Sequence, residues 1–348
     1  MVGYIKTITQ QQDSTIMFPQ DFLALCIDAN TILITGPQSL DGDSIGAALA
    51  LREMILQKTS SVVHIAGIPT HQYLHLSGID DWKPNTDLHD HYDVAIVVDG
   101  DRYRLESTVE TSFNKSKQTI LIDHHKSTET ESYNIAWLNP TAVSTCSMIY
   151  ELHQEWHCTL TPTIAESLYV GLLFDTGGFQ HSNTNADTMR LAAILMEQGF
   201  DANTTYIKVV KEKRPQGWKL QSAMFQNSTL LYNGIIHIAW VSVETMNTLG
   251  CDNGDIEGLV NDLRCTTGVD FAALIVGLSN GTHKVSLRSN PTFGDKEGID
   301  CSALAKSLSV RGGGHTRASG ARLDMNLQDS IEHVKTMSLQ FAQQSKPL

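Results

Sequence analysis

Four short motifs supply side chains that can bind a metal ion or move a proton. They are Asp41-Gly42-Asp43, Asp99 at the end of the run AIVVD, Asp123-His124-His125 at the end of TILID, and Asp175 within LYVGLLFDTGGF. Asp175 is the least ordinary of them, because a charge among so many apolar residues is costly unless it is paired or binds a metal.

The other motifs have plainer interpretations when each is taken alone. Asp43 could be a helix N-cap, and Asp99 could be a turn residue that follows a strand. Asp41 is left without a role by the N-cap interpretation, and a glycine between two aspartates would let both carboxylates turn inward. Asp123 could fix the tautomer of a metal-binding imidazole beside it.

Taken together, these motifs form a set of oxygen ligands with one nitrogen donor. Such a set suits Mn²⁺ or Mg²⁺ better than a metal that prefers cysteine. Two ions about 3.5–4 Å apart can share one aspartate, activate a water molecule and hold a phosphoryl group for in-line attack. The combination therefore predicts a two-metal hydrolytic site.

Two motifs in the second half of the chain could bind an anion. Gly312-Gly313-Gly314-His315 reads as a loop whose backbone N–H groups can approach a phosphate closely. The run KVSLRS ends in Arg288 and Ser289, and an arginine there can contact a phosphate with two N–H groups. Each could also be an ordinary surface feature, but their occurrence together in one small domain favours substrate binding.

Short apolar runs alternate with helical patterns in the first half, which predicts a parallel sheet covered by helices. Strands are expected at 31–35, 61–66, 93–99 and 118–123, and a helix at 44–57. Three of these runs end in, or lead directly to, acidic residues. Open α/β sheets bind ligands beyond the carboxyl ends of their strands, so the carboxylates lie where such a fold builds its site.

Helical periodicity continues over 144–212, and the basic segment 208–219, interrupted by Pro215 and Gly217, indicates a connector. Further strands are expected at 234–243, 270–279 and 283–289, and a helix at 301–309. We therefore expect a catalytic α/β domain at 1–200, a helical connector at 201–230 and a smaller α/β substrate-binding domain at 231–348. The active site would lie in the cleft between the two domains.

The composition argues against long nucleic acid as a partner. The chain has 38 acidic and 25 basic residues and a net charge of −13, whereas proteins that grip DNA or RNA neutralise phosphates with Lys and Arg. Six cysteines without a C-x-x-C pair indicate buried thiols in a reducing compartment, not a disulfide framework or a zinc site. The N-terminus lacks the apolar core of a signal peptide, and no run approaches roughly 20 apolar residues. We expect a cytoplasmic protein without a membrane partner.

The order of these motifs resembles the DHH phosphoesterases that carry a DHH-associated C-terminal domain. The resemblance extends from about Thr31 to Gly320 and includes Ser144-Thr145-Cys146 and GGGHTRASG. Within the family the chain is most similar to the stand-alone nanoRNases, which degrade very short oligonucleotides and often dephosphorylate 3′-phosphoadenosine 5′-phosphate. It is shorter than the RecJ exonucleases, and it lacks the membrane and sensory segments of cyclic di-AMP phosphodiesterases. The resemblance also implies that the protein could form a homodimer.

The resemblance implies a role for each candidate residue. One metal ion would bind Asp41 and Asp99, and the second Asp43, Asp99, His124 and Asp175, with Asp99 as the bridge. Asp123 and His125 would be catalytic, with His125 near the scissile phosphate. The far end of the substrate would be held by Arg288, Ser289, Gly313, Gly314 and His315.

One position departs from the family pattern. Members usually have a histidine four residues before the first aspartate, where it completes the first metal site, and this chain has Pro37. We expect a weaker first site, or one completed by water, Gln38 or the substrate. A stricter version of this hypothesis is a protein with one metal or with reduced activity.

Three other functions stay open from the sequence. The same metal chemistry serves phosphodiesterases of linear or cyclic dinucleotide messengers, and it serves polyphosphate or pyrophosphate hydrolases. A catalytically damaged protein that senses a small nucleotide is the non-enzymatic alternative, and Pro37 is its only support.

Overall fold

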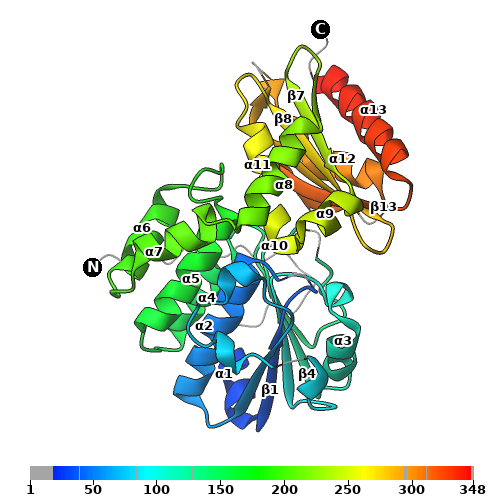
Figure 1. The fold of residues 1–348 in the computed structure, drawn as a ribbon. Coiled ribbons are helices and arrows are strands. Elements are labelled where there is room, and N and C mark those ends of the chain that lie inside the picture. Colours follow the sequence, from blue (N-terminus) through cyan, green and yellow to red (C-terminus); the bar gives the residue numbers. More distant parts are fainter. Residues whose placement is uncertain are drawn as a thin grey trace.

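The computed structural model describes residues 19–38, 40–83, 85–126, 128–293, 296–310 and 312–345. Two β-sheets, each covered by helices, form an N-terminal and a C-terminal half (Figure 1). The expected α/β architecture, with a parallel sheet first and a smaller sheet domain second, is confirmed. The division at residues 200 and 230 stays a prediction.

The first sheet is parallel, with five described strands in the order β2-β1-β3-β4-β5. The strands are β1 (Thr31–Thr35), β2 (Val62–Ala66), β3 (Val94–Val98), β4 (Gln118–Asp123) and β5 (Ile135–Leu138). The four strands predicted in this half are present with ends within one residue, whereas β5 was not predicted. The carboxyl ends of β1, β3 and β4 are neighbours, because these strands are adjacent in the sheet.

Alternate residues of this sheet pack on opposite faces, as the two-residue period of a strand requires. Ile32 and Ile34 of β1 join the core under one helical layer, while Leu33 joins the core on the other side. The first layer contains α1 (Pro19–Asp28), α2 (Gly42–Lys58), α4 (Thr145–Glu155) and α5 (Pro162–Asp175), and the second contains α3 (Ser107–Asn114). The apolar runs are therefore buried on both faces.

A helical segment leads from the first half to the second. It comprises α6 (Ala186–Met196), α7 (Ala202–Tyr206), a π-helix (Ile207–Lys211) and α8 (Pro215–Gln226). The predicted interruption is present at 212–214, directly before Pro215, which begins α8, whereas the prediction was wrong for Gly217, which lies inside that helix. Pro215 occupies the first turn, where a missing backbone N–H costs nothing. Glycine suits position 217 despite its low helix propensity, because the Cβ of any other residue would lie only 3.2 Å from Oδ1 of Asp255.

The second sheet is mixed, with the described strand order β12-β13-β9-β8-β7-β6. Its strands are β6 (Ser228–Leu231), β7 (Ile236–Val241), β8 (Phe271–Gly277), β9 (His283–Ser289), β12 (Gly313–His315) and β13 (Ala318–Leu323). A short hairpin, β10 (Thr292–Phe293) with β11 (Lys296–Glu297), follows β9. The predicted strands correspond to β7, β8 and β9, and the predicted helix at 301–309 corresponds to α12 (Cys301–Leu308).

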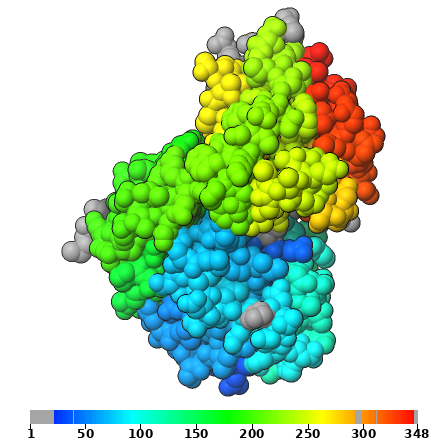
Figure 2. Space-filling view, in the orientation of Figure 1, coloured from blue at the N-terminus to red at the C-terminus, as the bar shows by residue number. Residues whose placement is uncertain are grey.

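Helices cover both faces of this sheet as well. Phe271 and Ile275 of β8 pack with α12 and α13 (Leu327–Ser345), whereas Leu274 packs with the helices on the opposite face. Those helices are α8, α9 (Val243–Leu249) and α11 (Leu259–Arg264), with α10 (Asn253–Ile256) before α11. In the space-filling view the C-terminal half rests on the N-terminal half, and the green helical segment borders both (Figure 2).

Short 3₁₀ helices at 71–73, 79–81, 85–87 and 102–104 complete the N-terminal half. No helix in the described ranges is long and apolar enough to cross a membrane. The six cysteines, all within those ranges, are free thiols; four are buried as expected, whereas Cys251 is half-buried and Cys265 is exposed.

Candidate metal centre and substrate cleft

Asp41 and Asp43 lie at the start of α2, but their local roles are the reverse of the plain interpretation. Asp41 is the N-cap, and its Oδ1 accepts hydrogen bonds from the backbone N–H groups of Asp43 and Ser44, each at 3.1 Å. Gly42 is required for space, because a Cβ there would lie 2.8 Å from Cβ of Phe174 and 3.0 Å from the Tyr73 hydroxyl. Asp43, freed from capping, points into the interior and is fully buried.

The carboxylate of Asp43 is held by the N-terminus of α4. Its Oδ2 accepts a hydrogen bond from the backbone N–H of Thr145 at 2.6 Å, and its Oδ1 accepts one from that of Cys146 at 2.9 Å. Ser144 caps the same helix. Unpaired N–H groups at a helix N-terminus stabilise an anion, so this contact fixes a buried carboxylate in place.

Asp99 lies at the turn directly after β3, with a left-handed φ of 59°. Its Oδ2 accepts a hydrogen bond from the Ser44 hydroxyl at 2.6 Å, and its Oδ1 accepts one from the Thr145 hydroxyl at 3.4 Å. Oδ1 also lies 3.7 Å from Nε2 of His124 and 3.6 Å from Nδ1 of His125. Asp99 therefore lies close to a ring nitrogen of each histidine.

Asp123 orients the two histidines that follow it. Its Oδ1 accepts hydrogen bonds from the backbone N–H of His124 at 2.8 Å and from Nδ1 of His125 at 2.8 Å, and its Oδ2 accepts one from Thr128. Burial alone would raise the pKa of Asp123, but the hydrogen bonds from His125 and Thr128 lower it, so this carboxylate stays ionised. The sequence predicted that Asp123 would fix a metal-binding imidazole; in the structure its ring contact is to His125, and Nδ1 of His124 faces the Ala142 carbonyl at 3.4 Å.

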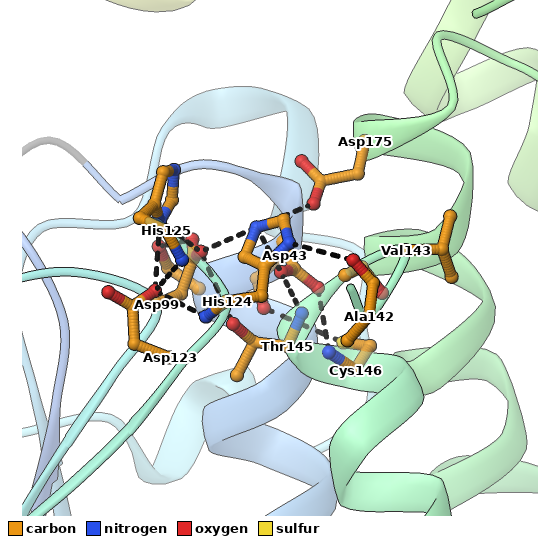
Figure 3. Close-up of polar contacts among 12 residues, drawn as sticks. Asp43, Asp99, Asp123, His124, His125, Ala142, Val143, Thr145, Cys146 and Asp175 are labelled. Carbon is orange, nitrogen blue, oxygen red and sulfur yellow. Dashed lines mark hydrogen bonds and ion pairs between the residues drawn. The ribbon is translucent and has the colours of Figure 1, made fainter. Parts of the chain in front are cut away.

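Asp175 ends α5 and reaches the same place from the opposite side (Figure 3). Its Oδ2 lies 3.0 Å from Nε2 of His124. Both atoms are buried, and among the described residues neither has a hydrogen-bond partner of suitable geometry. The two atoms form an ion pair when His124 is protonated, and a metal ion bound by both would take the place of that proton.

The electrostatics of the cluster also favour a cation. Burial and then the charge of Asp175 raise the pKa of Asp43 to about 7. Burial and the charges of Asp41 and Asp43 raise the pKa of Asp99 well above its usual range. Burial alone would lower the pKa of His124, but Asp175 raises it to about 10. The carboxylates thus repel one another until positive charge enters, and oxygen donors with one imidazole suit a hard divalent ion.

His315 brings the C-terminal half to this centre. Its ring centroid lies 5.0 Å from that of His125, in a stacked arrangement, and 5.3 Å from that of His124. Asp43, Asp99 and His124 form one group with metal-ligand spacing, and His124, His125 and His315 form another. The predicted ligands and His315 therefore lie together although they come from both halves of the chain.

The other C-terminal candidates line the same cleft at different depths. The hydroxyl of the buried Ser289 donates a hydrogen bond to the Ile299 carbonyl at 2.7 Å. Gly313 and Gly314 are not in a loop as predicted but in the edge strand β12, which pairs with β13 through a tight turn at Thr316 and Arg317. Because β12 pairs with β13, part of its backbone is engaged in the sheet, whereas a free loop would offer those backbone N–H groups to an anion.

The cleft between the two halves has a volume of about 2260 Å³. Its N-terminal wall includes Asp41, His124, His125 and Asp175, and its C-terminal wall includes Arg264, Lys284, Arg288 and His315. At its edge the Tyr73 hydroxyl donates a hydrogen bond to Oε1 of Glu257 at 3.2 Å, which joins the two halves. An acidic metal centre thus faces a basic wall.

Pro37 is buried beside the metal centre. A Cβ at Gly100, whose φ is 147°, would lie 2.6 Å from Cγ of Pro37, so the proline ring packs directly on the turn after Asp99. The adjacent Gln38 has an exposed side chain, and its backbone N–H donates to the Arg104 carbonyl at 2.7 Å. The place of the usual histidine is therefore filled by an apolar ring.

Sequence reasoning gave no role to Ser44, Thr145 or Thr128, which position the carboxylates of Asp99 and Asp123. The sequence offered one sign of the role of Thr145, which is that Ser144 can cap a helix. The residues directly after an N-cap have backbone N–H groups without helical partners, and those of Thr145 and Cys146 bind the carboxylate of Asp43.

Both halves of the chain match known protein domains. Residues 31–172 match the DHH family, N-terminal domain, and residues 236–343 match the DHHA1 domain. The chain contains a DHH domain followed by a DHHA1 domain. The family expected from the motifs is therefore confirmed.

This DHH–DHHA1 protein has relatives along most of its length. It is 27% identical over 299 residues to the bifunctional oligoribonuclease and PAP phosphatase NrnA of Bacillus subtilis, covering 84% of this chain and 90% of that protein. It is 25% identical over 296 residues to the probable bifunctional oligoribonuclease and PAP phosphatase NrnA of Streptococcus mutans, covering 84% and 89%. Its fold resembles an exopolyphosphatase-related protein from Bacteroides fragilis, with a TM-score of 0.80, 21% identity and coverage of 93% and 96%.

Proposed function

We propose that this protein is a metal-dependent phosphoesterase that hydrolyses very short oligonucleotides and 3′-phosphoadenosine 5′-phosphate. The observation that carries the proposal is the convergence of Nε2 of His124 and Oδ2 of Asp175, 3.0 Å apart, within a buried carboxylate cluster that faces a basic wall. The two NrnA relatives, whose names give both activities, support the choice of substrate.

Asp43, Asp99, His124 and Asp175 would hold one Mn²⁺ or Mg²⁺ ion, and Asp41 and Asp99 would hold a second. Bound there, the cations would supply Lewis-acid activation of the phosphoryl group and of a water molecule. The protein itself fixes the carboxylates: Ser44 and Thr145 orient Asp99, and the N-terminus of α4 orients Asp43.

His125 is proposed to contact the reacting phosphate. Because its Nδ1 is bound to Asp123 at 2.8 Å, its Nε2 is the nitrogen left for the substrate. Asp123 keeps the ring in one orientation, as a second carboxylate commonly does for a catalytic imidazole. His315 would close over the substrate from the C-terminal half, and Gly313, Gly314 and Ser289 would line the pocket beside Arg288.

The first metal site is proposed to be the weaker one. Pro37 offers no ligand atom, and Oδ1 of Asp41 is engaged by two backbone N–H groups of α2. Asp41 therefore has one oxygen free for a metal, and water or a substrate oxygen would complete the site. The identity of the ions, Mn²⁺ or Mg²⁺, and their number, two, belong to this proposal.

The experiment is a substrate panel with the purified protein in Mn²⁺ and in EDTA. It would contain a dinucleotide, a short oligoribonucleotide, a long RNA, 3′-phosphoadenosine 5′-phosphate, cyclic di-AMP and a short polyphosphate. Fast Mn²⁺-dependent turnover of the dinucleotide or the bisphosphate, with little on the long RNA, is expected. Preferred cleavage of cyclic di-AMP or polyphosphate would replace the proposed substrate class, and binding without turnover would favour a nucleotide sensor.

We also propose a cytoplasmic location, in keeping with six free thiols. A homodimer stays a prediction of the family resemblance.

A further inference from the structure

The turn that follows Asp175 has an unusual backbone. Gly177, Gly178 and Phe179 are three successive residues with left-handed φ angles of 57°, 67° and 67°. Glycine adopts such angles freely, whereas a phenylalanine does so only where the surrounding contacts hold it there. The turn therefore has a specific, strained shape directly behind a proposed metal ligand.

Two side chains from the far end of this turn bind the backbone carbonyl of Asp175. Nδ1 of His181 lies 3.1 Å from this oxygen, and Nδ2 of Asn183 donates a hydrogen bond to it at 3.1 Å. A carbonyl oxygen can only accept, so Nδ1 of His181 carries the proton. Asp175 is the last residue of α5, where a carbonyl has no partner within the helix. The two donors fix the backbone from which the Asp175 carboxylate projects.

Asn183 also reaches the backbone behind His124. Its Nδ2 donates a second hydrogen bond, to the Val143 carbonyl at 3.4 Å. The preceding carbonyl, that of Ala142, lies 3.4 Å from Nδ1 of His124 (Figure 3). One amide group therefore joins the segment that orients His124 to the helix end that carries Asp175. These are the two residues whose side chains meet at 3.0 Å in the metal centre.

The ring of His181 is held in place by packing on a glycine. A Cβ at Gly177 would lie 2.4 Å from Nε2 of His181, so a side chain there would displace the ring. On another side of the turn, a Cβ at Gly178 would lie 3.1 Å from Cγ1 of Val210 and 3.2 Å from the Tyr206 hydroxyl. The two glycines thus let the turn fit closely between the His181 ring and the helical connector.

The two side chains are not needed to end the helix. The carbonyl of Thr176 already accepts hydrogen bonds from the backbone N–H groups of Gln180 and His181, each at 2.8 Å. The Thr176 hydroxyl also accepts one from the N–H of Phe179 at 3.0 Å. Because these bonds close the turn locally, the contacts to the Asp175 carbonyl serve the position of Asp175 itself.

We propose that His181 and Asn183 are positioning residues that keep Asp175 and His124 at the spacing required to share a metal ion. Neither residue binds the ion; both act through backbone carbonyls. This inference rests on the metal site of the proposed function and extends it to a second layer of residues, which commonly sets the affinity of a metal site. Since His181 and Asn183 share one acceptor, either donor alone should preserve part of the geometry.

The test is Mn²⁺ affinity, measured by electron paramagnetic resonance without substrate. Asn183 is exposed on the cleft wall, so Asn183→Ala leaves the core intact. It should weaken Mn²⁺ binding about 10-fold. His181→Phe keeps a ring on Gly177 but has no donor, and it should weaken binding less. The double variant should lose more than the product of the two single losses, because the shared carbonyl then has no donor.

Asn185→Ala is the matched control. Asn185 lies two residues further along the same segment and caps α6, with its side chain accepting hydrogen bonds from the backbone N–H groups of Asp187 and Thr188. Its loss should lower the melting temperature without changing Mn²⁺ affinity. The spectrum of Mn²⁺ bound at saturation is a second readout, and it should change in Asn183→Ala but not in Asn185→Ala, since only the first alters the ligand geometry.

Unchanged Mn²⁺ affinity in Asn183→Ala and in the double variant would overturn the inference. A lower melting temperature with the wild-type affinity and spectrum would also overturn it, because Asn183 would then only end the helix. The substrate panel tests the proposed function separately. If the wild type binds Mn²⁺ and the substitutions weaken this binding, while no substrate is hydrolysed, the positioning role stands and the proposed function fails.

Discussion

Nε2 of His124 and Oδ2 of Asp175 lie 3.0 Å apart, although one residue follows a strand and the other ends a helix. Neither atom has a hydrogen-bond partner of suitable geometry in the described part of the chain. They form an ion pair while His124 is protonated, and a divalent ion held between the imidazole and the carboxylate would take the place of that proton.

Asp175→Asn should therefore weaken Mn²⁺ binding by about 100-fold or more and abolish turnover, because a neutral amide replaces a charged ligand. Electron paramagnetic resonance titration with Mn²⁺ measures the affinity directly. Asp187→Asn is the control: Asp187 is an exposed acid of the same cleft paired with Arg190, and its loss should leave Mn²⁺ affinity unchanged. Similar affinities for Asp175→Asn and the wild type would contradict the assignment.

Asp99→Asn separates metal binding from folding. Asparagine fits the left-handed backbone at this position, and the hydroxyls of Ser44 and Thr145 can still contact its amide. We expect metal binding and turnover to be lost, while the metal-free protein melts at the same or a higher temperature because one repelling carboxylate is gone. Calorimetry with and without Mn²⁺ tests both parts. A clear fall in the metal-free melting temperature would mean that Asp99 is chiefly a structural residue.

Pro37→His should restore a ligand to the first metal site. In the wild type we expect one tight and one weak Mn²⁺ site, and in the variant two sites of more similar affinity, measured by isothermal titration calorimetry. Pro37→Ala is the matched control, since it also removes the ring from Gly100 but adds no ligand. Two equally tight sites in the wild type would sink the idea that the proline weakens the centre.

Gly171→Ala should disturb the metal centre from within α5. An added Cβ would lie 2.3 Å from Sγ of Cys146 and 2.4 Å from Oδ1 of Asp43, so either the helix or the buried carboxylate must move. We expect a loss of about 1–3 kcal/mol in the free energy of unfolding, together with weaker Mn²⁺ binding. Gly313→Ala, where a Cβ meets open space, should change neither quantity. Unchanged metal affinity in Gly171→Ala would show that the centre tolerates the shift.

Asp93 gives a pH dependence of stability away from the active site. A hydrogen bond from Lys117 and others from Asn30 and Thr31 lower the pKa of Asp93 to about 2, so it stabilises the fold when ionised. Its contribution is full above the unfolded pKa of about 4 and is lost as pH falls toward about 2. Because Lys117 is 67% exposed and the pair is screened, we expect about 1 kcal/mol.

Denaturation of the wild type and Asp93→Asn over this pH range tests the prediction. The difference between them should be constant near neutral pH and shrink in acid. Asp90→Asn, which removes an exposed partner of Lys115, is the control and should show little difference at any pH. A gap between the wild type and Asp93→Asn that widens in acid would show that the sign of the effect is wrong.

The fold class and the placement of the carboxylates at the ends of strands follow from local patterns in the amino-acid sequence. Buried parallel strands are continuous apolar runs, and Asp99 and Asp123 follow such runs directly, so local pattern and chemistry agree. The motif order also identified the family. These features are local, because the periodicity of a strand or a helix depends on residues that are close together in the sequence and not on distant contacts.

The separate roles of the aspartates depend on tertiary contacts. Asp41 and Asp43 are equivalent as a sequence motif, and the choice between capping α2 and facing the metal centre depends on where the N-terminus of α4 lies. The glycines of β12 likewise form a strand because β13 pairs with them. Each outcome depends on contacts between residues distant in sequence, which periodicity cannot predict.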